Sequence, residues 1–250
     1  MDLPKPSPEA VAALAPTGTL RAAINLSNFL LVTGEADDGN PRGVSPGMAA
    51  ALAEHLGVGL ELLRYESPGA VADDGDADAW DIGNIGAEPQ RARFINFTAA
   101  YAEIEATYLV RADADISSID QVDKPGRTII APDRAAYALW LERNIQHAEL
   151  TLLQDRSGTY DAWVERRIDA LAGLRPGLIG DHERTPGSQL LDGCFMTVQQ
   201  AMGTPNDRDV AGFDYLRRFV EAAKAGGLVA ELIETHGVTG RLSVAPPATD

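Results

Sequence analysis

The sequence contains a single cysteine, Cys194, so it can form neither an intrachain disulfide nor a metal site built from several cysteines. Its four histidines are scattered and show neither an HxxH nor an HExxH spacing; they are His55, His147, His182 and His236. The sequence therefore gives no local support to a metal site, and we expect no cofactor.

Positive charge is also scarce. The 250 residues carry 21 Lys and Arg against 37 Asp and Glu, which gives a formal net charge of −16. Nucleic-acid binding needs clustered Lys and Arg for phosphate contacts, and none cluster here. The same acidity disfavours docking on anionic membranes. Neither a nucleic acid nor a membrane is therefore expected as a partner, and the charge favours solubility.

Long apolar runs are missing as well, since no 18-residue apolar segment occurs anywhere. The first residues, "MDLPKPSPEAV", lack the cationic start and apolar run of a secretory signal, and Ser7-Pro8 instead predicts the start of a helix. As the sequence stands, we expect a cytoplasmic protein. If an export signal has been removed from it, the expectation becomes periplasmic.

What is present is the composition of an ordinary globular protein, with 45% hydrophobic and 23% charged residues. Short β-prone runs alternate with helical patterns, and the second pattern, "GVSPGMAAALAEHLGV", places Ser45 and Pro46 at cap positions and Gly57 at its end. Strands are expected at 19–24, 59–65, 94–112 (as one or two runs), 127–132, 148–154, 169–174 and 194–203; helices are expected at 43–58, 133–145, 159–168 and 209–238, the last interrupted at Gly226-Gly227. This alternation predicts an α/β fold with a mostly parallel sheet.

Five segments in order carry a family resemblance. They are "GTLRAAI" (18–24), "GVSPGMAAALAEHLG" (43–57), "EPQRARFINFTAAY" (88–101), "RIDA" (167–170) and "YLRRFVEAAKAGGLVAELIETHG" (215–237). Together they resemble the family-3 solute-binding proteins of bacterial ABC transporters. Each segment alone is weakly specific, but their order and separations match over nearly the whole chain.

The resemblance implies the type II periplasmic-binding-protein fold, with two α/β lobes joined by two crossover strands around a ligand cleft. Lobe one would comprise residues 1–109 and 201–250, and lobe two residues 110–200. Hinge closure around a small molecule would be the expected motion. An ABC permease would be the partner if the protein is exported, and the oligomeric state stays open.

Arg91 aligns with the arginine that clamps the ligand carboxylate in this family. A guanidinium presents a planar fork of donors that matches a carboxylate. The alternative is that Arg91 pairs with one of the many acidic residues of the chain. Arg93 has no such counterpart and is expected to be a solvated neighbour.

The positions ahead of Arg91 depart from the family, which usually places small hydroxyl residues there. Here they are Gly83, Asn84 and Gly86, and a family threonine is replaced by Glu88. Glu88 is interpreted either as a solvated acid that complements a helix start or as a carboxylate in the cleft.

Amino-acid binders of the family carry an aspartate that receives the ligand ammonium, and Leu174 occupies that position here. An ammonium without a carboxylate partner would bind poorly in a dry cleft. Arg175 follows, pointing either into the cleft or outward. We therefore expect a small organic acid, with one or two acidic groups, in place of a standard α-amino acid.

Further cleft residues follow from the resemblance. The turn Ala131–Ala135 replaces a family hydroxyl turn; Asp133 is expected to cap the following helix, and Arg134 adds positive charge there. In lobe one the candidates are Asn25, Asn28 and Phe29, with Phe29 as an aromatic ligand cover or plain core. Gln199 would reach the ligand or satisfy hinge backbone.

Two classes of function remain open. The first is solute capture, which needs only the clamp and the hinge. The second is a dehydratase, isomerase or lyase on the same fold, with Glu88 as the catalytic acid or base, or less favourably Glu103 or Glu105. A cytoplasmic sensor or carrier is a third, weaker possibility.

Overall fold

A computed structural model describes residues 5–249 and places them in two compact units. Unit 1 contains the described residues up to Glu103 and from Gln199 onward, and unit 2 is Ile104–Val198. The chain passes from one unit to the other within β6 (Ile95–Val110) and returns within β11 (Met196–Pro205). The lobe boundaries expected from the sequence, after residue 109 and before residue 201, lie farther along these same two strands.

The sheet of unit 1 is built around β1 (Thr19–Asn25), which pairs in parallel with β4 (Gly59–Tyr65) on one side and β5 (Ile82–Gly86) on the other. β11 follows as an antiparallel neighbour of β5. All five residues of β5 are buried, as expected for a strand covered on both faces. The order β4-β1-β5-β11 brings the ends of β1 and β5 side by side.

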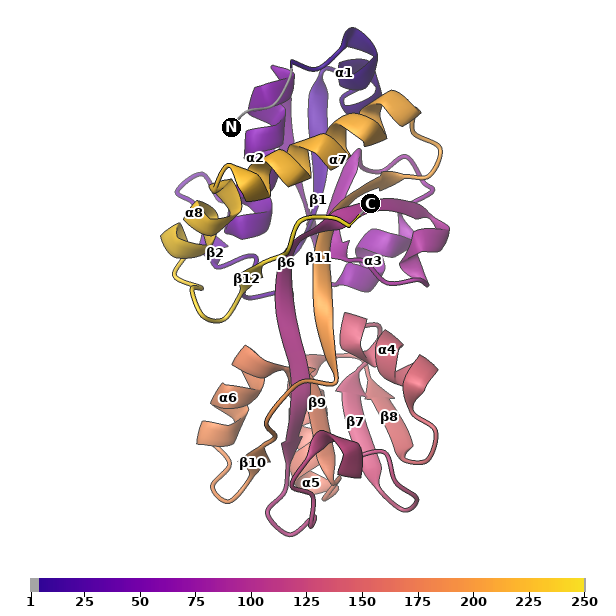
Figure 1. Ribbon diagram of the computed structural model, residues 1–250, viewed down its shortest axis with the longest axis vertical. Coiled ribbons are helices and arrows are strands. Elements are labelled where there is room, and N and C mark those ends of the chain that lie inside the picture. Colours follow the sequence, from indigo (N-terminus) through magenta and orange to yellow (C-terminus); the bar gives the residue numbers. More distant parts are fainter. Residues whose placement is uncertain (1–4, 250) are drawn as a thin grey trace. The chain divides into compact units, whose positions relative to one another are not determined.

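Helices cover this sheet, and Figure 1 shows the longest, α7 (Val210–Ala225), lying across the strands of unit 1. The others are α1 (Pro8–Leu14), α2 (Val44–Leu56), α3 (Pro68–Asp73) and α8 (Leu228–Thr235). Between β1 and α2 the chain forms a small separate antiparallel pair, β2 (Gly34–Glu35) with β3 (Pro41–Arg42). On the α3 side, Trp80 packs with Val71, Ile85 and Ile95 and is fully buried.

The helix ends test the cap predictions in unit 1. Ser7 caps α1, because its hydroxyl oxygen accepts the Ala10 N–H at 3.2 Å. Gly57 ends α2 at φ 68°, also as predicted. The prediction for Ser45 is wrong: α2 begins at Val44, so Ser45 lies inside the first turn, where its hydroxyl bonds to the buried Tyr101 hydroxyl at 2.9 Å.

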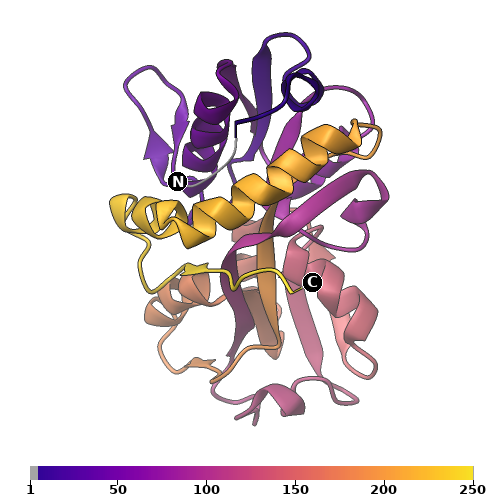
Figure 2. The same ribbon diagram turned by 45° about the horizontal axis from the view of Figure 1, so that its top comes forward.

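In unit 2, β7 (Thr128–Pro132) pairs in parallel with β8 (Glu149–Leu153) and β9 (Ala170–Leu174), and the second half of β6 is antiparallel to β9. β10 (Gln189–Leu190) adds to β6. The helices are α4 (Ala136–Asn144), α5 (Arg156–Glu165) and α6 (Arg175–Glu183), with a 3₁₀ turn at Ile119–Gln121. Trp163 and Leu178 anchor a core beneath them. The turned view in Figure 2 shows these helices from a second direction.

Two sequence expectations fail in unit 2. The sequence patterns did not predict α6. Asp133 is not the cap of α4, because that helix begins at Ala136 with Ala135 at the N-cap and no side-chain cap bond. The Asp133 amide instead donates to the Leu153 carbonyl at 2.6 Å, which ties the turn to β8.

The observed order of strands and helices is the predicted α/β fold with mostly parallel pairing. Within residues 5–249, none of the helices is long and apolar enough to cross a membrane. The same part of the chain holds no cluster of three or more His, Cys, Asp or Glu suited to a metal ion.

Candidate functional site

The candidate residues of unit 1 gather where its parallel strands end. Ile24 of β1 lies beside Asn84 of β5, and Asn25 is the last residue of β1. Gly86 is the last residue of β5, and the turn that carries Arg91 follows it. Ligands of open α/β sheets bind outside the carboxyl ends of the strands. This carboxyl edge is therefore the candidate site in unit 1.

Arg91 is the first residue of a 3₁₀ turn (Arg91–Arg93) and is only 4% exposed. Its Nη1–H donates to the Gly86 carbonyl oxygen at 2.7 Å, and its backbone N–H donates to the Glu88 carbonyl at 2.9 Å. A buried guanidinium must be held by such acceptors, because an ion taken out of water is costly. Arg93, by contrast, is exposed and lies near the Phe94 ring, in agreement with its expected place in solvent.

Glu88 is also buried, with 4% of its surface exposed. Its carbonyl accepts the N–H groups of Arg91 and Ala92, so it begins the turn that presents Arg91. The burial contradicts the interpretation of Glu88 as a solvated helix-start acid. A carboxylate enclosed at the same edge as the candidate clamp is the alternative that remains.

Asn84 is 1% exposed, and among the described residues neither its Oδ1 nor its Nδ2 has a hydrogen-bond partner. An unpaired buried amide costs about 1–3 kcal/mol. Such a group is normally satisfied by water or by a ligand, which supports the predicted role of Asn84. Its neighbour Gly83 has a different explanation, because a Cβ there would lie 3.3 Å from Trp80 and Val71; core packing accounts for that glycine without a ligand.

The loop after β1 is shaped by its own asparagines. Asn25 Oδ1 accepts the N–H and hydroxyl of Ser27, at 3.2 and 2.8 Å, and Asn28 Oδ1 accepts the Leu30 N–H at 3.2 Å. These bonds engage the amide oxygens, and the Nδ2 group of either residue could donate to a ligand. Phe29 is half-buried, and the Arg241 guanidinium lies 5.7 Å from its ring centre.

Gln199 stands where β11 enters unit 1. Its Nε2–H donates to Glu103 Oε1 at 3.0 Å, so it joins the two strands that connect the units. The partner in this bond is a side chain of β6, so a ligand contact by Gln199 and its bonding to hinge backbone both stay predictions. Glu103 and Glu105, the weaker acid/base candidates, both have partners, Gln199 and Arg175 respectively.

Unit 2 has a corresponding carboxyl edge, where β7 ends at Pro132 and β9 at Leu174. Arg134, in the turn after β7, is exposed and has φ 59°, in the left-handed region. That conformation costs a side-chain-bearing residue roughly 1–2 kcal/mol. Strained residues of this kind concentrate at functional sites, so its geometry supports the predicted role of Arg134.

Arg175, for which a cleft-facing and an outward orientation both stay open, is bonded within unit 2. Its Nε–H donates to Glu105 Oε2 at 2.6 Å, and its guanidinium also donates to the carbonyls of Leu191 and Gly193. Its charge is therefore partly compensated inside unit 2. Leu174 occupies the N-cap position of α6, and its apolar side chain makes no capping hydrogen bond. The carboxyl edge of unit 2 therefore has no carboxylate at this position.

Sequence reasoning missed a small cavity of about 10 Å³ behind this edge, enough for about one water molecule. Its lining includes Tyr137, Arg156 and Asp181. Arg156 pairs with the 3%-exposed Asp181 at 2.9 Å, and burial raises the pKa of Tyr137 to about 12. Asp181 lies in α6, the helix that was not predicted, so no signal in the sequence pointed to this cluster.

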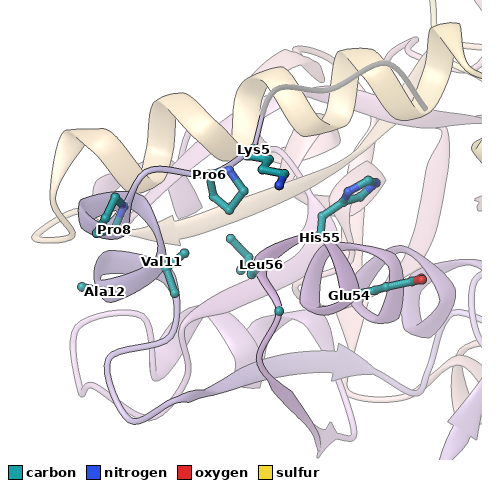
Figure 3. Close-up of a pocket in the computed structure, with 9 residues that line it drawn as sticks. Lys5, Pro6, Pro8, Val11, Ala12, Glu54, His55 and Leu56 are labelled. Atoms are coloured by element: carbon teal, nitrogen blue, oxygen red, sulfur yellow. The ribbon is translucent and has the colours of Figure 1, made fainter.

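Unit 1 also has a groove away from these residues. The groove has a volume of about 600 Å³. Figure 3 shows the side chains that line it, which come from the N-terminal segment with α1 and from the C-terminal end of α2. Its lining is Lys5, Pro6, Pro8, Val11, Ala12 and Glu54–Gly57. Gly57 lies two residues before the start of β4, so the groove is at the amino end of that strand, and its lining contains none of the candidate site residues.

The comparisons with known proteins agree with this architecture. The sequence model of bacterial extracellular solute-binding proteins, family 3, matches residues 28–238. The chain therefore belongs to this family, and it is a solute-binding protein of the ABC-transporter type. Its α/β structure matches the type II periplasmic-binding-protein fold.

Several solved structures are similar in fold. A mutant of ArgBP from T. maritima has a TM-score of 0.71 at 15% identity, over 91% of this chain and 99% of that one. An amino acid ABC transporter substrate-binding protein from Streptococcus pneumoniae, bound to L-arginine, has a TM-score of 0.71 at 20% identity, over 95% of this chain and 100% of that one. The ancestral amino acid-binding protein AncCDT-1, a precursor of cyclohexadienyl dehydratase, has a TM-score of 0.71 at 17% identity, over 91% of this chain and 98% of that one. No curated protein sequence matches the chain.

Proposed function

We propose that this solute-binding protein binds a small organic acid, with Arg91 as the carboxylate clamp. The observation that carries the proposal is the buried guanidinium of Arg91, fixed by the Gly86 carbonyl at the carboxyl edge of unit 1. A desolvated guanidinium binds a carboxylate through short, charge-assisted hydrogen bonds, roughly twice as strong as neutral ones. Asn84, with its unpaired amide, would add a donor or acceptor beside it.

The proposed ligand differs from those of the similar structures, one of which holds L-arginine. Leu174 supplies no carboxylate for an α-ammonium, and an unpaired ammonium would lose its hydration without compensation. Arg134, at its strained turn, is our candidate for a second cation, and the left-handed φ of 59° is the observation that supports it. The proposed ligand is therefore a molecule with one or two acidic groups and no free ammonium.

The test is a thermal-shift panel of short mono- and dicarboxylic acids and the standard α-amino acids. The wild-type protein should be stabilised by one or more organic acids, because a ligand that binds only the folded state raises the melting temperature. Arg91→Ala should abolish the shift, whereas the control Arg93→Ala, at an exposed arginine two residues away, should keep it. Stabilisation by α-amino acids alone would refute the proposed ligand class.

Catalysis is the second candidate, and the burial of Glu88 beside Arg91 is the observation that favours it. An enclosed carboxylate can serve as an acid or base in dehydratase, isomerase or lyase chemistry. Incubating each stabilising acid with the protein and recovering it for NMR separates the two. Unchanged compounds support binding alone, and conversion that is lost in Glu88→Gln would establish an enzyme.

We further propose that the protein delivers its ligand to an ABC permease. In that role the binding protein acts on the outer side of the cytoplasmic membrane. The family relation supports this role. Fractionation of the native cells with an antibody to the protein tests it. Recovery with periplasmic or surface markers fits transport, and recovery with cytosolic markers would favour an enzyme, sensor or carrier.

A further inference from the structure

Residues 243–248 are bound along unit 1. β12 (Ser243–Val244) pairs antiparallel with β6, with Ser243 opposite Glu103 and Val244 opposite Ala102. The next amide, of Ala245, donates to the Tyr101 carbonyl at 3.1 Å. Figures 1 and 2 both show this segment running beside β6. Leu242 and Ala245 are 3% and 5% exposed, so the contact buries apolar surface as well as backbone.

A second set of bonds fastens the same segment to α7. Lys224 Nζ donates to the Pro246 carbonyl at 2.8 Å and also pairs with Glu221 at 2.7 Å, while only 4% of its side chain is exposed. The Ala248 N–H donates to Glu221 Oε2 at 3.2 Å. A buried ammonium requires acceptors, and the segment supplies one of them. We call residues 242–249 the C-terminal strap.

The strap grips β6 at a particular place. Ala102 and Glu103 are the last residues of β6 that belong to unit 1, and the strand continues into unit 2 from Ile104. Glu103 also accepts the Nε2–H of Gln199, the first residue of β11 inside unit 1. The pairing of the strap with β6 therefore ends at Glu103, the last residue of β6 in unit 1. Glu103 is in turn bonded to the first residue of β11 in unit 1.

We propose that the C-terminal strap sets where the connection between the units bends. By adding a strand to β6 up to Glu103, it makes that half of β6 part of the rigid sheet and confines bending to Ile104 and beyond. Bending motions use a few residues that absorb the backbone change while their neighbours stay packed. The inference rests on the proposed function only in that the bend is taken to serve closure on a ligand.

Hydrogen exchange of the ligand-free protein tests the strap directly. A chain that ends at Arg241 should exchange the amides of residues 100–103 at least about tenfold faster than the wild type, because that stretch loses its paired edge. The amides of β1 should keep their rates. A chain that ends at Ala248 is the matched control, since it retains every strap bond named above and should exchange like the wild type.

A second variant covers the possibility that the truncated chain does not fold. Ala245→Pro removes the single N–H that donates to Tyr101, and Thr249→Pro places the same ring at an exposed position four residues on. Faster exchange at 100–103 in Ala245→Pro but not in Thr249→Pro supports the strap. Equal rates at 100–103 in a folded truncated or Ala245→Pro protein would overturn it. Failure of the organic-acid panel would refute the proposed function and leave this exchange result unaffected.

Discussion

The guanidinium of Arg91 and the carbonyl of Gly86 are joined by a 2.7 Å hydrogen bond inside the protein. Gly86 ends β5, and the chain turns through Glu88 to bring Arg91 back over that end. The strand thus orients the arginine that follows it five residues later. This geometry holds the side chain before any ligand arrives, so binding requires little loss of side-chain entropy.

Arg134 should show a conflict between stability and binding. Replacing it by glycine relieves a φ of 59° and should raise the free energy of unfolding by about 1 kcal/mol. The same change removes a cation from the carboxyl edge of unit 2 and should weaken binding of organic acids. Urea unfolding and calorimetric titration of Arg134→Gly measure the two effects.

Arg167 provides the matched control, since it also lies in unit 2 with a left-handed φ, of 55°. Its exposed side chain pairs with Asp113, a contact worth at most about 1 kcal/mol. Arg167→Gly should leave ligand affinity unchanged. If Arg134→Gly also leaves affinity unchanged, Arg134 has no part in the site.

Leu174→Asp should change ligand preference and stabilise α6 together. Leu174 is the N-cap of α6 without a side-chain bond, and an aspartate there gains about 0.5–2 kcal/mol as a cap. It also restores a carboxylate for an α-ammonium, so α-amino acids should begin to stabilise the protein in the thermal-shift panel.

Leu174→Asn separates these effects, because asparagine caps a helix without a charge. It should stabilise the protein and leave its ligand preference as in the wild type. Amino-acid binding by Leu174→Asn, or its absence in Leu174→Asp, would show that this position does not select against an ammonium.

Among the carboxylates of unit 1, Asp81 should be the one whose neutralisation lowers the free energy of unfolding most. It is fully buried and accepts bonds from Arg21 and Arg208, both at 2.8 Å. Breaking a buried ion pair costs about 3–5 kcal/mol. Asp81→Asn should therefore lower the free energy of unfolding by a few kcal/mol. Asp78→Asn, at a side chain that contacts the same arginines but is 78% exposed, should cost less than about 1 kcal/mol.

His236 should make stability depend on pH in the mildly acidic range. Burial, together with the charge of Arg42, lowers the pKa of His236 below its ordinary value of 6.5. The folded state then binds fewer protons than the unfolded state as the pH falls below 6.5, so the stability that His236 contributes above that pH is lost on acidification. Urea unfolding between about pH 7.5 and 5 should show a smaller loss for His236→Gln. An identical slope in both proteins would contradict this.

Much of the fold could be predicted because its signals are local. Strand runs such as 19–24 and 169–174, and the glycine that ends α2, follow from hydrophobic pattern and turn chemistry. The cap predictions at Ser45 and Asp133 failed because tertiary bonds, to Tyr101 and to Leu153, use those residues instead. Helix α6 escaped because Pro176 and two glycines obscure its pattern.

The family resemblance supplied the candidate site residues, but the contacts that several of them make could not be predicted. The family resemblance gave Arg91 its expected role, and in the structure Arg91 lies in the turn after β5, at the carboxyl edge of the parallel strands. Spacing could not show that Glu105 engages Arg175, since the two are 70 residues apart. Nor could it show that Trp80 packs over Gly83, or that the amide of Asn84 lacks a partner in the described chain.

The most direct test of the account is a calorimetric titration of wild-type and Arg91→Ala protein with the organic acid that stabilises the wild type most. Removing one partner of a desolvated charge pair costs about 2–5 kcal/mol, so the dissociation constant should rise by more than about 30-fold. Arg93→Ala should match the wild type. Wild-type affinity in a folded Arg91→Ala protein would contradict the carboxylate clamp.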